Sequence, residues 1–319
     1  MVLGTFAALT LSLFSCKGEK KQEAEQTQTE TAAAQTAEPT APAVAKQFSY
    51  TPPVPTNGSL CAVVELGAAG FNSFIIKKDK TAWEPVKADY GVSGVLEGDT
   101  SDEEVEKRLK TYIKEIIDQG VPGSKIFFVV SSGAAKEEMI PQIEKLLKKQ
   151  GYYVNIVTPK QEAEYGFKAT VPAEFASKAF FVDMGSGNTK IAYMDQGKTV
   201  TQESYGAKYT KKNIDANTAY EDLKQKIAQI PAAQRQYCFL IGGVPYDLAK
   251  FTNGGNIDPR YVSLSLKASD YNAFAQSEGE KMQNGINLYD AIMDAAPECE
   301  YVVFDTKVNF TIGFLLGLN

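Results

Sequence analysis

The sequence predicts a two-lobed α/β fold with a cleft between the lobes, and two observations support this prediction. From about residue 60 onward, apolar runs of strand length alternate with amphipathic runs of helix length, as in α/β domains. An apolar–acid–apolar–glycine pattern also ends a predicted strand twice, at Val64–Gly67 and at Val182–Gly185. A second strand follows each time, so the same hairpin is predicted once per lobe, in 58–178 and in 179–319.

Composition restricts the possible chemistry. The chain has 319 residues, of which 44% are hydrophobic and 23% are charged, and its net charge is −6. This acidic balance argues against a nucleic-acid-binding surface, which would be basic. The chain contains no histidine, which excludes a Ser-His-Asp triad, a Cys-His pair and imidazole metal ligands. A general base would have to be a carboxylate, a lysine, a tyrosine or a cysteine.

The first 57 residues differ from the rest of the chain. Residues 1–15 are almost wholly apolar or small, too short a run to span a bilayer, and they suit a secretory leader. Leu13–Cys16 resembles a bacterial lipobox, in which the cysteine is lipidated, although Phe14 is large and no basic residue precedes the run. The alternatives are an uncleaved anchor or a buried strand.

Residues 17–57 are rich in polar residues, Ala and Pro and predict a disordered tether. A signal peptide of 1–16, lipid on Cys16 and this tether together predict a lipoprotein of the cell envelope. It would be periplasmic or attached to the outer membrane, and its lipid would make the membrane a partner. The other cysteines form no C-x-x-C pair, so a structural zinc site is not expected, and a single disulfide among them stays open: Cys61, Cys238 and Cys299.

In the first lobe, strands are expected at 61–67 and 71–76, followed by a loop around Trp83–Gly98. A helix then begins at a capping box of Ser101 and Glu104 and ends at Gly120. Its apolar face is expected to consist of Val105, Leu109, Tyr112, Ile113, Ile116 and Ile117. A strand at 125–130, a turn at Ser131–Gly133, a helix at 136–149, a strand at 153–157 and a short helix from Pro159 complete the lobe.

The second lobe is predicted to begin with the hairpin around Asp183–Thr189. A helix is expected at 211–230, and one or two more lie within 261–275 and 284–295. Strands are expected at 237–241 and 301–304. The apolar tail 310–318 is too short for a membrane span.

The segment Asp183–Thr189 is the candidate for chemistry. A glycine turn between two strands brings consecutive backbone N–H groups to one point, where they can bind an anion. The carboxylate of Asp183, at the end of the strand, suits a hard cation, which in turn can hold a phosphate. The simpler interpretation is a hairpin with a glycine turn and an incidental aspartate.

The order of strand, Gln161-Glu162-Ala163 helix, and strand with Asp-x-Gly-x-Gly-x-Thr resembles the Ppx/GppA family. This family contains exopolyphosphatases and guanosine pentaphosphate phosphohydrolases and has the two-lobed actin-like fold. The resemblance covers about residues 60–319. The matching segments are 64–71, 129–136, 161–163, 183–189, 241–245 and 305–316.

The resemblance implies a site and a reaction. Water would attack the terminal phosphoryl group of a polyphosphate or another phosphorylated small molecule, with Glu162 as general base. Asp183, together with Glu65, would hold Mg²⁺. Phosphate would be bound by Gly67, Ala68, Lys136, Gly185, Ser186, Gly187, Asn188, Thr189 and Lys190. Phosphoryl transfer depends mainly on positioning and charge neutralisation, so it needs no histidine.

The sequence departs from the family pattern at four places. Glu65 replaces an aspartate, and 68–70 (Ala-Ala-Gly) replaces Ser-Asn-Ser, which removes side-chain donors. Lys136 replaces an arginine that would bind phosphate with two parallel hydrogen bonds. Lys190 replaces an acid that helps to hold the metal. This lysine would either pair with phosphate in place of the metal or prevent metal binding.

Three hypotheses follow. The first is a metal-dependent phosphoanhydride hydrolase that uses Glu162 and Asp183. The second is a lipoprotein that binds phosphate or polyphosphate without turnover. The third is a structural envelope protein that has kept the fold and lost the site. Removing one preorganised electrostatic group typically costs about 10²–10³ in rate, so the four departures weigh against full catalysis.

Overall fold

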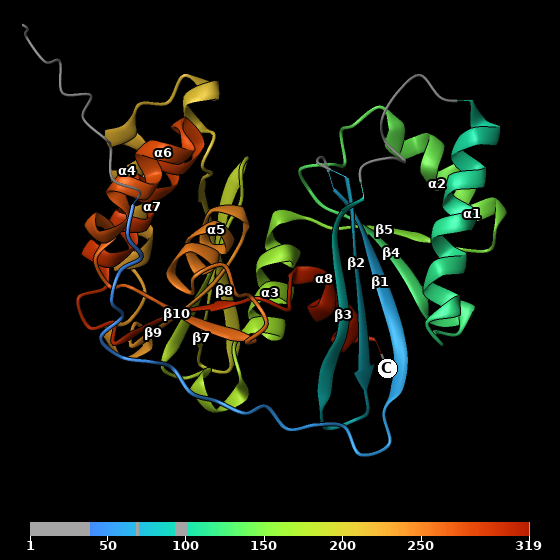
Figure 1. Ribbon diagram of the computed structural model, residues 1–319, viewed down its shortest axis with the longest axis horizontal. Coiled ribbons are helices and arrows are strands. Elements are labelled where there is room, and N and C mark those ends of the chain that lie inside the picture. The colour runs from blue at the N-terminus through green and yellow to red at the C-terminus, as the bar shows by residue number, and fades with distance from the viewer. Residues whose placement is uncertain (1–38, 68–69, 93–100, 319) are drawn as a thin grey trace, which may run out of the picture. The chain divides into compact units, whose positions relative to one another are not determined.

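The computed structural model describes residues 39–67, 70–92 and 101–318 (Figure 1). Residues 39–319 form one compact unit. The predicted signal peptide with Cys16, residues 17–38 of the predicted tether, and Ala68 lie outside the described residues. The three remaining cysteines, Cys61, Cys238 and Cys299, are buried free thiols, so the disulfide left open by the sequence is not formed.

The first sheet has the strand order β3-β2-β1-β4-β5. Its strands are β1 (Ser59–Gly67), β2 (Gly70–Lys78), β3 (Trp83–Val92), β4 (Ile126–Val130) and β5 (Val154–Ile156). The expected β1–β2 hairpin is confirmed, and β4 pairs parallel with β1. The prediction of a loop from Trp83 was wrong as far as Val92, because this segment pairs antiparallel with β2. Its Pro85 is tolerated because β3 is an edge strand.

Two helices cover one face of this sheet: α1 (Asp102–Asp118) and α2 (Met139–Lys149). The Ser101 hydroxyl accepts a hydrogen bond from the Glu104 N–H, as the capping pattern predicts. The predicted apolar face of α1 is buried except at Ile117, which is 42% exposed and was wrongly placed inward. The α2 helix begins at Met139, since residues 132–136 form turns.

The second sheet has the order β10-β11-β9-β6-β7-β8. Its strands are β6 (Ala179–Met184), β7 (Asn188–Asp195), β8 (Lys198–Tyr205), β9 (Tyr237–Ile241), β10 (Tyr261–Leu264) and β11 (Tyr301–Asp305). The predicted β6–β7 hairpin and the strands β9 and β11 are confirmed. The strand β8 was not expected from the sequence. The helix expected from Tyr261 is wrong there because Tyr261–Leu264 pairs with β11.

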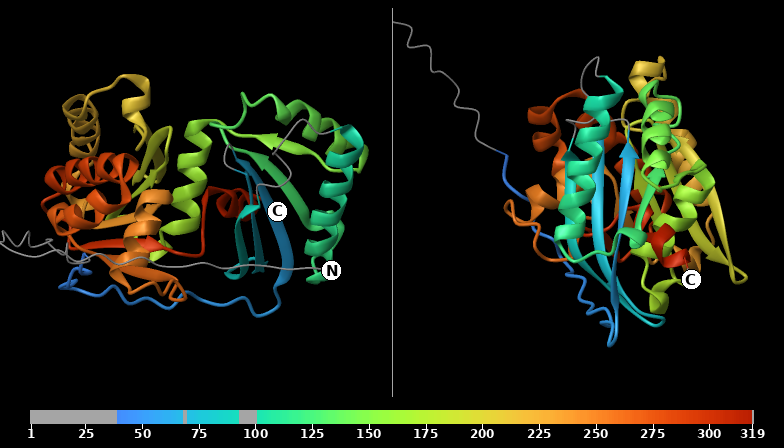
Figure 2. Two further views of the ribbon diagram at one scale, coloured as in Figure 1. Left: turned by 45° about the horizontal axis from the view of Figure 1, so that its top comes forward. Right: turned by 90° about the vertical axis from the view of Figure 1, so that its right-hand side faces the viewer.

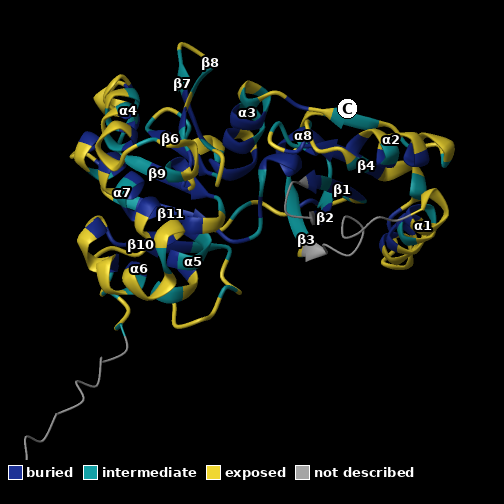
Figure 3. Ribbon diagram, turned by 90° about the horizontal axis from the view of Figure 1, so that it is seen from above, coloured by how far each residue is buried: buried dark blue, intermediate teal, exposed yellow. Residues whose placement is uncertain are grey.

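The helices of this half are α4 (Ala216–Ala228), α5 (Gly243–Thr252), α6 (Asn272–Glu278) and α7 (Glu280–Ala295). The helix predicted from 211 begins only at Ala216, because Asn213 has a left-handed backbone with φ 57° and Asp215 caps the helix. The inner strands of the two sheets and the inner helix faces are largely buried, whereas the outer helix faces are exposed (Figure 3).

Two helices lie side by side between the sheets: α3 (Pro159–Thr170) and α8 (Phe310–Gly317) (Figures 1 and 2). Thr158 and Gln161 form a capping box at the start of α3. The helices approach closely at Gly313, where a Cβ would lie 1.9 Å from the Tyr165 carbonyl oxygen. The α8 helix is the apolar tail of the sequence and also contacts β1. No helix within the described ranges is long and apolar enough to cross a membrane.

Residues 39–58 form an extended strap, seen in blue in Figure 1, that contacts both halves of the fold. At one end, Phe48 packs edge-on against Phe239 and Tyr261, and its N–H donates to Ser263 Oγ at 2.7 Å. At the other end, the Thr56 N–H donates to the carboxylate of Asp79 at 2.8 Å. The predicted tether of 17–57 therefore has a packed segment at its end.

Candidate functional site

The two hairpins place equivalent pairs of residues opposite one another. In β1–β2, Glu65 lies opposite Asn72, and in β6–β7, Asp183 lies opposite Lys190. Directly opposed residues project on the same face of a sheet, so each acid contacts its partner. The Asn72 amide donates to Glu65 Oε2 at 2.9 Å, and Lys190 Nζ lies 3.3 Å from Asp183 Oδ2. The internal repeat predicted from the sequence thus extends to side-chain contacts.

Lys190 is the centre of the second pair. It is only 8% exposed, and its ammonium contacts two carboxylates: Asp183, which is 8% exposed, and Glu162, which is fully buried. The distance from Nζ to Glu162 Oε2 is 2.7 Å. Burial alone would lower the pKa of Lys190, but the charges of Asp183 and Glu162 outweigh burial and raise that pKa above 10.5. The ammonium is therefore charged at physiological pH.

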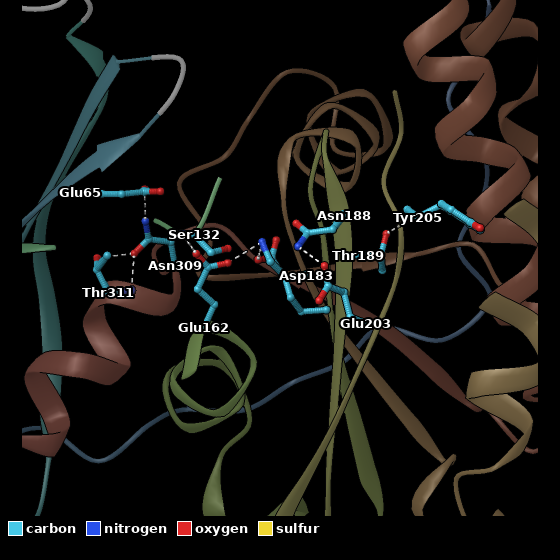
Figure 4. Close-up of polar contacts among 11 residues, drawn as sticks. Glu65, Ser132, Glu162, Asp183, Asn188, Thr189, Glu203, Tyr205, Asn309 and Thr311 are labelled. Atoms are coloured by element: carbon cyan, nitrogen blue, oxygen red, sulfur yellow. Dashed lines mark hydrogen bonds and ion pairs between the residues drawn. The ribbon is translucent and has the colours of Figure 1, made fainter. Parts of the chain in front are cut away.

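Glu162 projects from the first turn of α3. Its Oε1 accepts a hydrogen bond from the backbone N–H of Ser132, in the turn after β4 (Figure 4). Its Oε2 forms an ion pair with Lys190 and makes no hydrogen bond within the described residues. Both oxygens of this carboxylate are thus in contact with a donor of the protein.

Glu65 is the third acidic residue expected at the site, and two side-chain amides donate to its carboxylate. Its Oε2 accepts from the side-chain amide of Asn72 at 2.9 Å. The same oxygen accepts from the amide of Asn309 at 2.7 Å (Figure 4). Asn309 also caps α8, since its Oδ1 accepts from the Thr311 N–H at 2.9 Å. Desolvation raises the pKa of Glu65 to about 7, although the residue keeps partial exposure; the Asn72 amide lowers it, and Asp183 and Glu162 raise it further. Glu65 is therefore poised to gain or lose a proton near neutrality.

The glycine turn of the second hairpin presents free backbone donors. The Gly185 N–H donates within the turn, to the carbonyl oxygens of Asp183 and Asn188. In the part of the chain that the structure describes, the N–H groups of Ser186 and Gly187 donate to no protein acceptor, and both residues are exposed. Two adjacent free N–H groups beside a lysine are suited to binding an anion.

Residues 206–208 pack against this turn and form hydrogen bonds with its backbone. Ala207 and Lys208 donate their N–H groups to the carbonyl oxygens of Gly185 and Ser186, at 3.0 and 2.9 Å. The segment approaches so closely that a Cβ on Gly206 would lie 2.5 Å from the Asn188 nitrogen. Residues 206–208 therefore fix the shape of the turn, a role that the sequence did not reveal.

The side chains at the end of the turn are used by the fold itself. The Thr189 hydroxyl is buried and donates to the Tyr205 carbonyl at 2.7 Å, and the Asn188 amide donates to Glu203 at 2.7 Å (Figure 4). The backbone of these two residues, and not their side chains, was expected to bind phosphate. The side chains join β7 to β8.

Two other residues expected to bind phosphate, Lys136 and Gly67, lie outside the group of side chains around Lys190. Lys136 is exposed, in the turn between β4 and α2, and no hydrogen bond or ion pair joins it to the described residues of the cluster. Gly67 is the last residue of β1, opposite Gly70. Of the acidic residues expected from the sequence, Glu162 and Asp183 meet at Lys190. Glu65 bonds to Asn72 and Asn309 instead, and the charges of the other two carboxylates act on its pKa.

The residues present do not fit Mg²⁺. This ion needs near-octahedral oxygen ligands at about 2.0–2.1 Å. Between Asp183 and Glu162 stands the Lys190 ammonium, at distances of 3.3 and 2.7 Å. No group of three or more acidic or cysteine side chains within the described ranges is placed to hold a metal.

Three other features of the structure were not expected from the sequence. Asn309 bridges Glu65 and α8, and its signal was present as an Asn directly before an apolar run, which is a preferred N-cap. The Ser132 N–H holds Glu162 through a tertiary contact that no local pattern indicates. A cavity of about 930 Å³ also lies away from the cluster and is lined in part by Tyr50, Trp83, Tyr165, Glu174, Arg260 and Tyr261.

Comparisons with known proteins give one consistent result. No family model and no curated protein sequence matches the chain. Among solved structures, the Ppx/GppA enzyme of Aquifex aeolicus aligns with a TM-score of 0.61 at 13% identity, covering 82% of this chain and all of the other. An exopolyphosphatase from Cytophaga hutchinsonii aligns with a TM-score of 0.57 at 14% identity, covering 82% of this chain and 99% of the other.

These similarities define the class of fold. The chain has the two-lobed, actin-like α/β fold of the Ppx/GppA phosphatase structures, as the sequence predicted. At 13–14% identity the likeness is one of fold.

Proposed function

We propose that the site between the two hairpins binds the phosphoryl end of a polyphosphate-type ligand and does not hydrolyse it. Two features support binding: the free N–H groups of Ser186 and Gly187, and the exposure of both residues. Hydrogen bonds from backbone N–H groups to an ionised phosphate are among the stronger ones in proteins.

The observation that carries the absence of hydrolysis is the engagement of Glu162. A general base needs an oxygen within hydrogen-bond reach of the proton that it removes from water. Here Oε1 accepts from the Ser132 N–H and Oε2 contacts Lys190, and the carboxylate is fully buried. The Glu162 carboxylate is therefore held by contacts within the protein, and the turn with Ser186 and Gly187 is the part of the site that would contact the ligand.

The test is calorimetric titration of the full chain, carrying C16S to avoid lipid, with tripolyphosphate and with orthophosphate. Phosphate release is measured in the same samples. The S186P variant removes one N–H donor, and its affinity should fall by about tenfold, in line with a charge-assisted hydrogen bond. The matched control S186A keeps the N–H and should bind like the parent.

Two outcomes contradict the proposal. Equal affinities of S186P, S186A and the parent would remove the turn from the binding site. Release of phosphate above background that is lost in E162Q would establish a phosphoanhydride hydrolase instead. Hydrolysis is the second candidate because Glu162 and Asp183 lie on either side of one cation next to the turn. A positively charged lysine can stabilise a transferring phosphoryl group without a metal.

We also propose that the protein acts in the cell envelope, tethered by lipid on Cys16. The apolar residues 1–15, the lipobox-like Leu13–Cys16 and the polar segment after it support this proposal. Incorporation of a labelled fatty acid into the expressed chain, and its loss in C16S, is the expected result. Equal labelling of both chains, or none of either, would contradict lipidation at Cys16.

A further inference from the structure

We propose that Lys190 is the resident cation of this site: its ammonium takes the place of a divalent metal between Glu162 and Asp183, so that a single substitution, K190E, turns the two carboxylates into part of a metal site. This proposal concerns the chain without ligand and does not depend on the proposed function. It rests on register, distance, burial and charge.

Register places the lysine where a shared cation would have to be. Lys190 is directly opposite Asp183 on neighbouring strands, and its side chain extends along the same face to the first turn of α3, where it meets Glu162. The same position of the first hairpin is occupied by the neutral Asn72. The charge at this position is therefore a property of the second hairpin alone.

Burial makes the cation necessary. Glu162 is fully buried and Asp183 is 8% exposed, and uncompensated carboxylates in such surroundings are strongly unfavourable. No other cationic side chain contacts either carboxylate in the described residues. Lys190 thus supplies the neutralising charge that a bound metal would otherwise supply.

The net charge of the site is the same with Lys190 and with Glu at this position plus a bound divalent metal. Two carboxylates with one ammonium carry one net negative charge, and so do three carboxylates with one divalent cation. Replacing Lys190 by Glu therefore changes the local charge by the charge of one divalent ion. A Glu at this position would extend from the strand toward both acids and add a third oxygen donor, and oxygen donors are the ligands that Mn²⁺ and Mg²⁺ prefer.

The experiment titrates Mn²⁺ into the full chain carrying C16S and counts bound ions by electron paramagnetic resonance. The parent is expected to show no site that depends on Asp183, and K190E is expected to bind one Mn²⁺ at least about tenfold more tightly. Adding D183N to K190E should remove this site. The matched control K136E makes the same charge change at an exposed position of the neighbouring turn and should leave Mn²⁺ binding as in the parent.

Each result decides the proposal. A Mn²⁺ site in the parent that D183N abolishes would show that metal displaces the lysine, and this overturns the proposal. So would a K190E chain that has the circular dichroism of the parent and yet binds no more Mn²⁺ than K136E. If K190E does not fold, the parent titration and K190Q remain, and K190Q should gain affinity for Mn²⁺ because the resident charge is gone. The Mn²⁺ titrations contain no phosphate or polyphosphate. Their outcome is therefore independent of whether the protein binds phosphate, which the calorimetric titration tests.

Discussion

Lys190 lies directly across the β6–β7 ladder from Asp183, with its Nζ 3.3 Å from Oδ2, and the same ammonium reaches Glu162 Oε2 at 2.7 Å. One side chain thus joins the second hairpin to helix α3. Glu162 is in turn bonded to the turn after β4, so the contact continues into the first sheet. These contacts therefore connect the second hairpin to the turn after β4.

Breaking this buried contact should destabilise the protein. The K190M variant keeps the length of the side chain and leaves two carboxylates without their cation, and it should lower the free energy of unfolding by about 3 kcal/mol. Urea unfolding followed by circular dichroism measures this change. K212M, at an exposed lysine that bonds the Gly187 carbonyl, should cost less than about 1 kcal/mol. If K190M and K212M lower the free energy of unfolding by the same amount, the buried ion pairs of Lys190 stabilise the fold no more than an exposed hydrogen bond does.

The state of Glu65 should make stability depend on pH. Its pKa is raised from 4.5 to about 7 in the folded protein, so between these values the folded chain keeps a proton that the unfolded chain has released. The free energy of unfolding should consequently fall as pH rises through this range, by up to about 3 kcal/mol for this group. The measurement is the difference between the parent and E65Q, which cannot titrate. Parallel pH profiles of the two proteins would contradict the assignment.

Asn309 should couple the end of α8 to the first hairpin. N309A removes both the cap and the donor to Glu65, and it should cost about 2 kcal/mol, whereas N309S keeps a capping hydroxyl and should cost about half as much. Thermal unfolding of the two variants provides the comparison. The amide also favours the charged form of Glu65, so both variants should shift the titration of Glu65 upward. An unchanged titration in both would remove Asn309 from this role.

The strap should contribute to stability through Phe48. Truncation in F48A removes ring contacts with Phe239 and Tyr261 and should lower the free energy of unfolding by about 2 kcal/mol, less than for a fully buried phenylalanine. The control V54A lies in the same strap at a residue that is 65% exposed and should be neutral. If F48A is also neutral by chemical denaturation, the strap does not hold the fold.

The sequence predicted those parts that follow from local patterns. The repeated hairpin, the capped helix at Ser101 and the acid-rich start of α3 depend on neighbouring residues, and all were found. β3 was missed because its charges and Pro85 are those of an edge strand, which lacks a clear alternation. Tyr261–Leu264 is short and becomes a strand only because β11 lies beside it.

The candidate site was predicted in its acidic residues but not in their connections. Glu162 was named as the general base and Asp183 as a metal ligand, and Lys190 was recognised as the position that decides whether a metal is held. That its ammonium contacts both carboxylates depends on the register of β6–β7 and on the packing of α3, which a single sequence does not specify. The side-chain bonds of Asn188 and Thr189 were not foreseen because their acceptors lie on β8, a strand that the sequence did not indicate.

The strap also determines how the fold would respond to a pull on its N-terminal side. Tension applied ahead of Lys46 would act first on the Lys46–Glu300 pair and on Phe48, at the second sheet, and only afterwards on Thr56 and the first residue of β1. The second half of the fold would thus take the load before the first. In a molecule held at its N-terminal end, the contacts of the strap with the second sheet would break before the β1–β2 hairpin, which carries Glu65, is disturbed.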